Sequence, residues 1–158
     1  MAAFNIQQIG VIRSAGEDSA IEVFEPYRPA LEKLDQFSHV MVFWWAHQFD
    51  NDAKRQITRV ELPYAPGQTA GVFATRTEPR PNPIGLTTCS INRIDLASGV
   101  LHISWIDAFD GTPVLDLKPY LPFSDRVRDV HVAEWFAGWP GWLEDSADFF
   151  ADHPIFEE

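Results

Sequence analysis

Short runs of apolar and β-branched residues, broken by proline, glycine and polar residues, fill the first 118 positions of the chain. The runs of strand length are residues 4–13, 20–24, 40–45, 69–75, 86–94, 100–106 and 114–117. Apolar and polar positions alternate in part over the first two of these, which is typical of strands. Residues 40–45 form an unbroken apolar run, so we expect a strand buried on both faces.

The segments between these runs have the composition of turns and loops. Ala97-Ser98-Gly99 is turn material that joins residues 86–94 to residues 100–106 as a hairpin. Residues 29–34 predict a brief helical turn with Pro29 near its start, and the polar residues 50–68 predict a loop. Helical patterns of ten or more residues are missing from this region. The pattern therefore predicts an all-β body, either a barrel or a sandwich.

The C-terminal segment has a different composition from the body. Residues 130–158 contain seven acids and no lysine or arginine, and they hold seven of the chain's 21 aromatic residues. Aromatic side chains in this number are too costly to leave in water. We expect one or two short helices that pack on the body or on a second subunit, with the acids facing outward. The sequence thus predicts a β domain over residues 1–125 and an extension over residues 126–158.

Composition narrows the classes of function. The 158 residues are 46% hydrophobic and 13% aromatic, as expected of one globular chain. The net charge of −11 argues against a surface that binds nucleic acid everywhere, but residues 1–129 carry only −4, which leaves room for a local basic patch. A single cysteine excludes an internal disulfide. Because Met1-Ala2-Ala3 begins no secretory signal and no apolar run approaches about 18 residues, we expect a cytoplasmic protein without a membrane span.

A proline-rich stretch is the first segment that could carry chemistry. Prolines alternate at positions 79, 81 and 83, which fixes φ and removes hydrogen-bond donors, so the stretch predicts a stiff crossing between two strands. Arg76, Arg80 and Asn82 offer donors that could hold a carboxylate or a phosphate. A structural crossing with solvated arginines is equally consistent with the residues.

Carboxylates at strand ends form the second candidate, and two histidines form the third. Asp107, Asp110 and Asp116 could accept from ribose hydroxyls, hold an ammonium group or act as a base. Asp110-Gly111 also has the composition of a plain turn. His39 and His47 flank the apolar run, where structural roles at the strand ends are the alternative. With one cysteine and no histidine pair at metal-ligand spacing, we expect no metal site.

Six segments of the chain resemble, in the same order, the motifs of the TsaA-like family. They are Ile9-Gly-Val-Ile-Arg-Ser14, Phe37-Ser-His39, His47-Gln48, Gly71-Val-Phe-Ala-Thr-Arg76, Arg80-Pro-Asn-Pro-Ile-Gly85 and Asp110-Gly-Thr-Pro-Val-Leu-Asp-Leu-Lys-Pro-Tyr120. The resemblance covers residues 4–124. It implies a small single-sheet β-barrel and S-adenosyl-L-methionine-dependent methylation of N6 of threonylcarbamoyl-adenosine 37 in tRNA. It also implies a homodimer with cofactor sites near the subunit interface.

The resemblance further implies site residues. The cofactor-binding positions are His47, Gln48, Arg76, Leu86, Asp107, Ala108, Phe109 and Asp110, with Arg80 and Asn82 in the same motifs. A carbamoylated N6 must lose a proton during methylation, and residue type alone makes His39, Asp107 and Asp110 the candidate bases. Longer family members also carry a Gln-Pro-Gly segment that lines the cofactor, and residues 14–20 lack it.

Three functions are consistent with these observations. The first is methylation of the modified adenosine in tRNA, although the acidic charge is a poor match to a polyanion. The second is a methyltransferase of the same fold that acts on a small molecule. The third is a module that binds S-adenosyl-L-methionine without catalysis.

Overall fold

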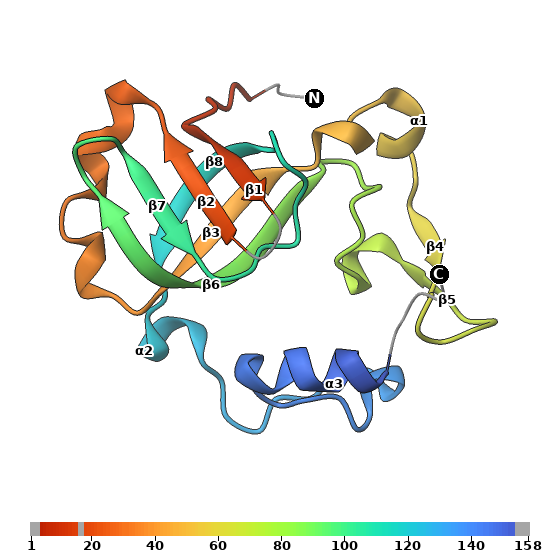
Figure 1. Cartoon of the computed structure of the whole chain (residues 1–158). Helices are drawn as coiled ribbons and strands as arrows, with labels where there is room; N and C mark the ends of the chain where they lie inside the picture. Colours follow the sequence, from red (N-terminus) through yellow and green to blue (C-terminus); the bar gives the residue numbers. More distant parts are fainter. Residues whose placement is uncertain (1–3, 16–17, 154–158) are drawn as a thin grey trace. The chain divides into compact units, whose positions relative to one another are not determined.

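The computed structural model describes residues 4–15 and 18–153, and the chain divides into two compact units (Figure 1). The first unit comprises residues 1–57 and 76–126, and the second comprises residues 58–75 and 127–158. The start Met1-Ala2-Ala3 and the last aromatic and acidic residues, Phe156, Glu157 and Glu158, lie outside the described residues.

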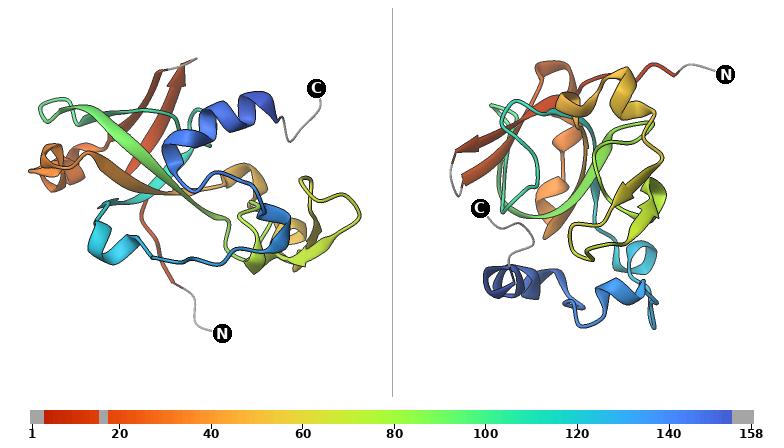
Figure 2. Two further views of the ribbon diagram at one scale, coloured as in Figure 1. Left: turned by 90° about the horizontal axis from the view of Figure 1, so that it is seen from below. Right: turned by 90° about the vertical axis from the view of Figure 1, so that its right-hand side faces the viewer.

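Six antiparallel strands form the sheet of the first unit. They are β1 (Gly10–Ala15), β2 (Asp18–Val23), β3 (His39–Trp45), β6 (Ile84–Asp95), β7 (Val100–Ile103) and β8 (Pro113–Pro119). Their hydrogen-bonded order is β1-β2-β7-β6-β3-β8, and β1 pairs again with β8, so the sheet closes on itself (Figure 2). The prediction of a β-sheet body followed by a short C-terminal helix is confirmed.

Short helical segments lie between these strands or follow the last of them. In the first unit they are η1 (Glu25–Leu31), η2 (Leu34–Gln36), η3 (His47–Phe49), α1 (Asp52–Arg55) and α2 (Pro122–Asp125). Lys33 adopts a left-handed conformation with φ of 67°, which separates η1 from η2. The helix α1 lies inside the segment predicted as a loop. The side chain of Asn51 caps it by accepting the Lys54 N–H at 3.0 Å.

Strand β3 shows that one face, not two, is buried. Residues alternate along it between buried positions, Val40, Val42 and Trp44, and partly exposed ones, Met41, Phe43, Trp45 and His39. The expectation of burial on both faces is therefore wrong. The outer apolar face is partly covered by cationic side chains instead, since the ammonium of Lys118 lies 5.7 Å from the Phe43 ring centroid.

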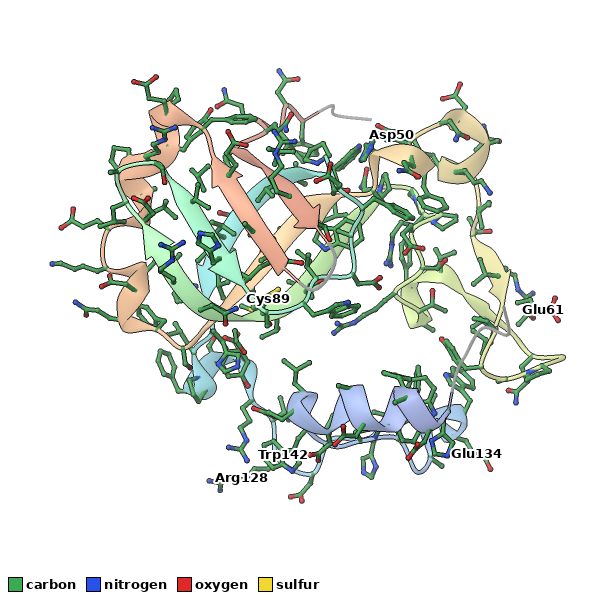
Figure 3. The ribbon with its side chains drawn as sticks, in the orientation of Figure 1. Asp50, Glu61, Cys89, Arg128, Glu134 and Trp142 are labelled. Atoms are coloured by element: carbon green, nitrogen blue, oxygen red, sulfur yellow. The ribbon has the colours of Figure 1, made fainter. Side chains whose placement is uncertain are left out.

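The core of the first unit lies on the inner side of the closed sheet. It combines residues from all six strands with Leu31, Leu34 and Ile106 from the connections. Cys89 on β6 is fully buried there (Figure 3), and burial raises the pKa of its thiol to about 12. The thiol consequently stays protonated at physiological pH.

The predicted β6–β7 hairpin is confirmed, because the two strands pair antiparallel across residues 96–99. The carboxylate of Asp95 accepts the backbone N–H groups of Ala97 and Ser98 at 3.0 and 3.2 Å. Hydrogen bonds from the Ser98 side chain and backbone lower the pKa of Asp95. Gly99 closes the turn with φ of +75°.

The second unit joins the C-terminal segment to residues 58–75, which the sequence pattern had placed in the body. Its elements are β4 (Arg59–Glu61), β5 (Thr69–Gly71), η4 (Val72–Ala74), η5 (Glu134–Phe136), η6 (Leu143–Asp145) and α3 (Ser146–Asp152). The predicted strand 69–75 is thus shorter than expected. None of the helices in residues 4–15 and 18–153 is long and apolar enough to cross a membrane.

Aromatic rings hold the second unit together. The ring of Trp139 contacts those of Tyr64, Phe136, Phe149 and Phe150, at centroid distances from 4.9 to 5.6 Å. The acidic side chains of residues 130–153 are exposed, as the sequence predicted: Glu134, Glu144, Asp145, Asp148 and Asp152.

Candidate functional site

A pocket of about 250 Å³ lies in the first unit where β3 ends. Its lining comes from the end of β3 with η3, from the β7–β8 connection, and from the proline-rich crossing. The lining residues are Trp44, Ala46, His47, Gln48, Phe49, Glu78, Trp105, Ile106, Asp107, Ala108, Phe109 and Thr112.

The end of β3 brings His47 and Gln48 to the pocket. The Ala46 N–H donates to the carbonyl of Pro83 at 2.8 Å, and the Phe49 N–H donates back to the carbonyl of Ala46 at 2.9 Å. These bonds turn the chain out of the strand into η3, so that the side chains of His47 and Gln48 are exposed at the pocket.

The β7–β8 connection is tied to β1, which shapes the opposite side of the pocket. The Gly111 N–H donates to the carbonyl of Ile12 at 2.9 Å, and the carboxylate of Asp110 accepts the Ser14 N–H at 3.0 Å. Between these ties and β7, Trp105 and Phe109 remain 65% and 60% exposed. Two large aromatic surfaces are therefore available to a ligand.

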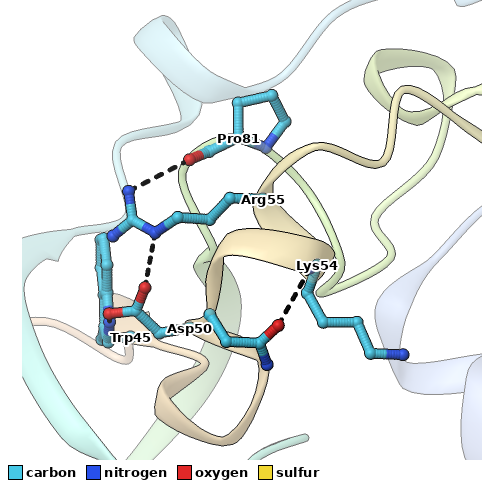
Figure 4. A network of polar contacts seen from close by, with 6 residues as sticks. Trp45, Asp50, Lys54, Arg55 and Pro81 are labelled. Atoms are coloured by element: carbon cyan, nitrogen blue, oxygen red, sulfur yellow. Dashed lines mark hydrogen bonds and ion pairs between the residues drawn. The ribbon is translucent and has the colours of Figure 1, made fainter.

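A polar clamp joins the end of β3 to the proline-rich crossing (Figure 4). The carboxylate of Asp50 accepts from Trp45 Nε1 at 2.9 Å and from Arg55 Nε at 2.5 Å. The guanidinium of Arg55 also donates to the carbonyl of Pro81 at 3.4 Å and lies 5.3 Å from the Trp45 ring centroid. The hydrogen bond from Arg55, and then that from Trp45, lowers the pKa of Asp50. The same bond raises the pKa of Arg55.

The charges around the pocket are one-sided. Its lining holds the carboxylates of Glu78 and Asp107 and the imidazole of His47, and no lysine or arginine is among the described lining residues. Aromatic faces attract cations, and carboxylates pair with them. The pocket is slightly smaller than the roughly 300–1,000 Å³ of sites that enclose a whole drug-sized ligand. The pocket therefore suits a cationic molecule that has a flat ring, and part of this molecule would lie outside the pocket.

The pocket brings together five of the residues predicted to bind the cofactor. These are His47, Gln48, Asp107, Ala108 and Phe109. Asp110 follows directly in the chain, but its carboxylate is engaged in the tie to Ser14. The roles of these residues stay predictions.

The other predicted site residues lie elsewhere in the described part of the first unit. Arg76, Arg80, Asn82 and Leu86 belong to the crossing and to the start of β6, outside the pocket lining. His39 begins β3, so at roughly 3.3 Å per residue it lies about 20 Å from the pocket end of that strand. Its Nδ1 is 2.8 Å from Ser38 Oγ and its Nε2 is 3.2 Å from Ser90 Oγ.

The sequence also predicts that the Gln-Pro-Gly motif is missing from residues 14–20 and that the protein has no metal site. The segment that lacks the Gln-Pro-Gly motif includes Gly16 and Glu17, which lie outside the described residues. Within residues 4–15 and 18–153, no group of three or more histidine, cysteine or carboxylate side chains is arranged to hold a metal ion.

Sequence reasoning missed seven lining residues: Trp44, Ala46, Phe49, Glu78, Trp105, Ile106 and Thr112. Two of them had a usable signal. Glu78 is the one acid in the proline-rich crossing, between Arg76 and Arg80. Trp105 lies near the end of the predicted strand 100–106 and precedes Asp107 by two positions, where strand ends and the loops after them commonly line sites.

Comparisons with known proteins match this architecture. The model of the family described as tRNA-methyltransferase O N-terminal domain matches residues 7–126. A probable S-adenosyl-L-methionine-binding protein of Methanothermobacter thermautotrophicus is 36% identical over 136 residues, which cover 77% of this chain and 93% of the relative. The tRNA (adenine(37)-N6)-methyltransferase of Escherichia coli K12 is 34% identical over 151 residues, which cover 82% of this chain and 63% of that enzyme.

A solved structure shows a similar fold. The crystal structure of TrmO from Pseudomonas aeruginosa superposes with a TM-score of 0.66 at 31% identity, over 85% of this chain and 62% of the TrmO chain. The chain thus spans less than two thirds of the Escherichia coli enzyme and of the solved TrmO chain.

Proposed function

Since the chain belongs to the family of the tRNA-methyltransferase O N-terminal domain, we propose that it is an S-adenosyl-L-methionine-dependent methyltransferase that acts on N6 of adenine 37 in tRNA. This membership agrees with the resemblance to the TsaA-like family seen in the sequence. The observation that carries the proposal is the pocket at the end of β3. It joins the carboxylates of Glu78 and Asp107 and four aromatic rings with the motif residues His47 and Gln48.

The residues of this pocket fit the proposed cofactor. S-adenosyl-L-methionine is cationic at sulfur and at its amino group and carries an adenine ring, and when bound it supplies an activated methyl group. The exposed rings of Trp105 and Phe109 suit the flat adenine. The carboxylates of Glu78 and Asp107 suit the cationic groups and the ribose hydroxyls. Arg76, Leu86, Arg80 and Asn82 remain proposed contacts for the parts of the cofactor that extend outside the pocket.

Positioning is the main task that this site would perform. Methyl transfer is an in-line displacement, so holding the acceptor nitrogen and the methyl group in line provides much of the rate increase. Of the three candidate bases, Asp107 is the one that lines the pocket, and we propose that its carboxylate takes the N6 proton. Asp110 and His39 already hold partners elsewhere in the fold.

We also propose the finer features that the sequence suggests. The closed sheet would be the β-barrel of a domain over residues 1–125, with residues 126–158 as its extension. The protein would act as a cytoplasmic homodimer with cofactor sites near the subunit interface. The tRNA would contact a basic patch drawn from the arginines of residues 1–129.

A second candidate, a module that binds S-adenosyl-L-methionine without transferring a methyl group, is favoured by one observation. The Methanothermobacter relative, 93% of which is covered, is named for binding alone. The third candidate function is methylation of a small molecule.

One experiment distinguishes the three functions. The purified chain is incubated with S-adenosyl-L-methionine labelled in the methyl group, together with tRNA from a strain that lacks the gene, or with a small-molecule cell extract. We expect label at N6 of a tRNA adenine, and we expect Asp107→Asn to abolish it while calorimetry still detects cofactor binding. Label in the small-molecule fraction alone would identify the third function. Binding without any transfer would identify the binding module and overturn the proposal.

A further inference from the structure

Glu78 is the charged group of the pocket that no motif of the sequence explains. It lies in the proline-rich crossing and lines the pocket together with Asp107, yet the motif residues on either side of it, Arg76 and Arg80, do not. Among the described residues, neither Glu78 nor Asp107 takes part in an ion pair. Two acidic residues without an ion-pair partner among the described residues therefore line one small pocket that also holds four aromatic rings.

The backbone around Glu78 is held rigidly. Pro79 and Pro81 fix φ at two of the next three positions. Arg80 donates to the carbonyl of Thr77 at 3.5 Å, and Arg55 of the clamp donates to the carbonyl of Pro81 at 3.4 Å. Glu78 itself is half-buried. Its carboxylate is thus anchored at the pocket by a preorganised segment rather than by a free loop.

A fixed negative charge of this kind discriminates between cations and neutral molecules of the same shape. In methyl transfer the bond between the methyl carbon and sulfur breaks, its electron pair stays on sulfur, and a new bond forms between the methyl carbon and the acceptor nitrogen, which loses a proton. The donor is a sulfonium cation, whereas the product is a neutral thioether of nearly the same shape. Coulomb attraction to a nearby carboxylate therefore favours the donor and is lost with the methyl group.

We infer that Glu78 is a specificity-determining residue that makes the pocket bind S-adenosyl-L-methionine more tightly than S-adenosyl-L-homocysteine. This inference rests on the proposed function, because it takes the proposed cofactor as the ligand of the pocket. It goes further in assigning the choice between donor and product to a single side chain. Release of the spent cofactor would follow from the loss of its sulfonium charge.

Calorimetric titration of the full chain with each of the two ligands tests the inference. We expect the wild-type chain to prefer S-adenosyl-L-methionine. Glu78→Gln should weaken binding of the donor by roughly threefold to fivefold, as expected for a partly exposed charge pair, and change that of the product by less than twofold. Glu78→Asp, which keeps the charge, should retain the preference. Glu61→Gln removes an exposed carboxylate from β4 and serves as the matched control.

The outcomes separate the inference from the proposed function. If Glu78→Gln weakens both ligands equally, or neither, while the wild-type chain binds them, the inference is wrong and the proposed cofactor stands. The Glu78→Asp variant could lose the preference for S-adenosyl-L-methionine over S-adenosyl-L-homocysteine while its thermal unfolding stays unchanged. The pocket would then distinguish the two ligands by the shape of the side chain and not by its charge, and the inference is again wrong. If the wild-type chain binds neither ligand, the proposed function fails, and the inference fails with it.

Discussion

Gly85 leaves the space in which the indole of Trp44 forms one wall of the pocket. The two residues face each other across β3 and β6. A Cβ atom at position 85 would lie 2.1 Å from Trp44 Cε2 and 2.3 Å from Cζ2, far inside van der Waals contact. Trp44 cannot simply move, because it is buried and its Nε1 donates to Thr87 Oγ1 at 3.1 Å. The packing of the Trp44 indole therefore explains why the Arg80–Gly85 motif ends in a glycine.

We therefore expect Gly85→Ala to displace the Trp44 ring. Overpacking of this kind costs about 1–3 kcal/mol of unfolding free energy, and the ring movement should also weaken binding of S-adenosyl-L-methionine. Urea denaturation, near-ultraviolet circular dichroism and calorimetry measure the three effects. Gly141→Ala is the control, since nothing lies within 4 Å of a Cβ there. Equal behaviour of the two variants would show that the contact between Gly85 and Trp44 does not shape the pocket.

Single residues of the site were predictable where they come soon after a predicted strand. His47 and Asp107 follow strands closely, and the pocket includes both. Glu78 and Trp105 each had a positional signal, but neither belongs to a motif, and composition does not show which loop side chains a fold turns toward one another. Arg76 lies outside the pocket lining, because the lining depends on backbone direction, which spacing alone does not fix, and its role at the cofactor stays a prediction.

At the scale of elements, the clamp through Asp50 organises the exit from β3. It links the strand, through Trp45, to α1 and to the crossing, through Arg55. The lowered pKa of Asp50 shows that the folded state favours its charged form. The charged carboxylate of Asp50 therefore stabilises the fold fully at pH values above the ordinary aspartate pKa of 3.8. This stabilisation is lost as the pH falls through the lowered pKa of Asp50 in the folded state.

We expect Asp50→Asn to lower the free energy of unfolding by about 1 kcal/mol at pH 7, since the pair is only partly exposed but makes several hydrogen bonds. The difference from wild type should shrink as the pH falls below the ordinary aspartate pKa. Urea unfolding at pH 7, 4 and 3 measures it. Glu22→Gln is the matched control, because the Arg13–Glu22 pair is 55% and 45% exposed and should contribute little. If the difference in unfolding free energy between wild type and Asp50→Asn does not depend on pH, the charge of Asp50 does not stabilise the fold.

The strands were predictable from the sequence, but their environments were less so. Apolar runs identified β3 and the β6–β7 hairpin because β-branched and aromatic residues favour strands wherever they lie. The same run over β3 could not show which face is buried. Phe43 and Trp45 point outward, where Lys118 and Arg55 from other segments lie over their rings. Likewise, α1 has only four residues, too few for a periodic pattern.

At the scale of the whole molecule, charge is the property most relevant to the proposed tRNA partner. The net charge is −11, and four of the acids, Glu144, Asp145, Asp148 and Asp152, are exposed in or next to α3. Fields from exposed charges extend about 30 Å at 10 mM ionic strength but only about 8 Å at physiological ionic strength. These acids should therefore slow the encounter with a polyanion mainly at low salt.

A variant in which all four acids are replaced by their amides, Glu144→Gln with Asp145→Asn, Asp148→Asn and Asp152→Asn, tests this effect by changing the net charge from −11 to −7. We expect tRNA to bind about threefold to tenfold more tightly at roughly 10 mM ionic strength, because long-range repulsion is weaker. The gain should vanish near 300 mM salt, and calorimetry should show unchanged affinity for S-adenosyl-L-methionine. The high-salt measurement is the internal control, since only screened repulsion disappears there. An affinity for tRNA that is the same for both proteins at low salt would mean that these acids do not oppose the partner. A gain that persists at high salt would point to a direct contact instead.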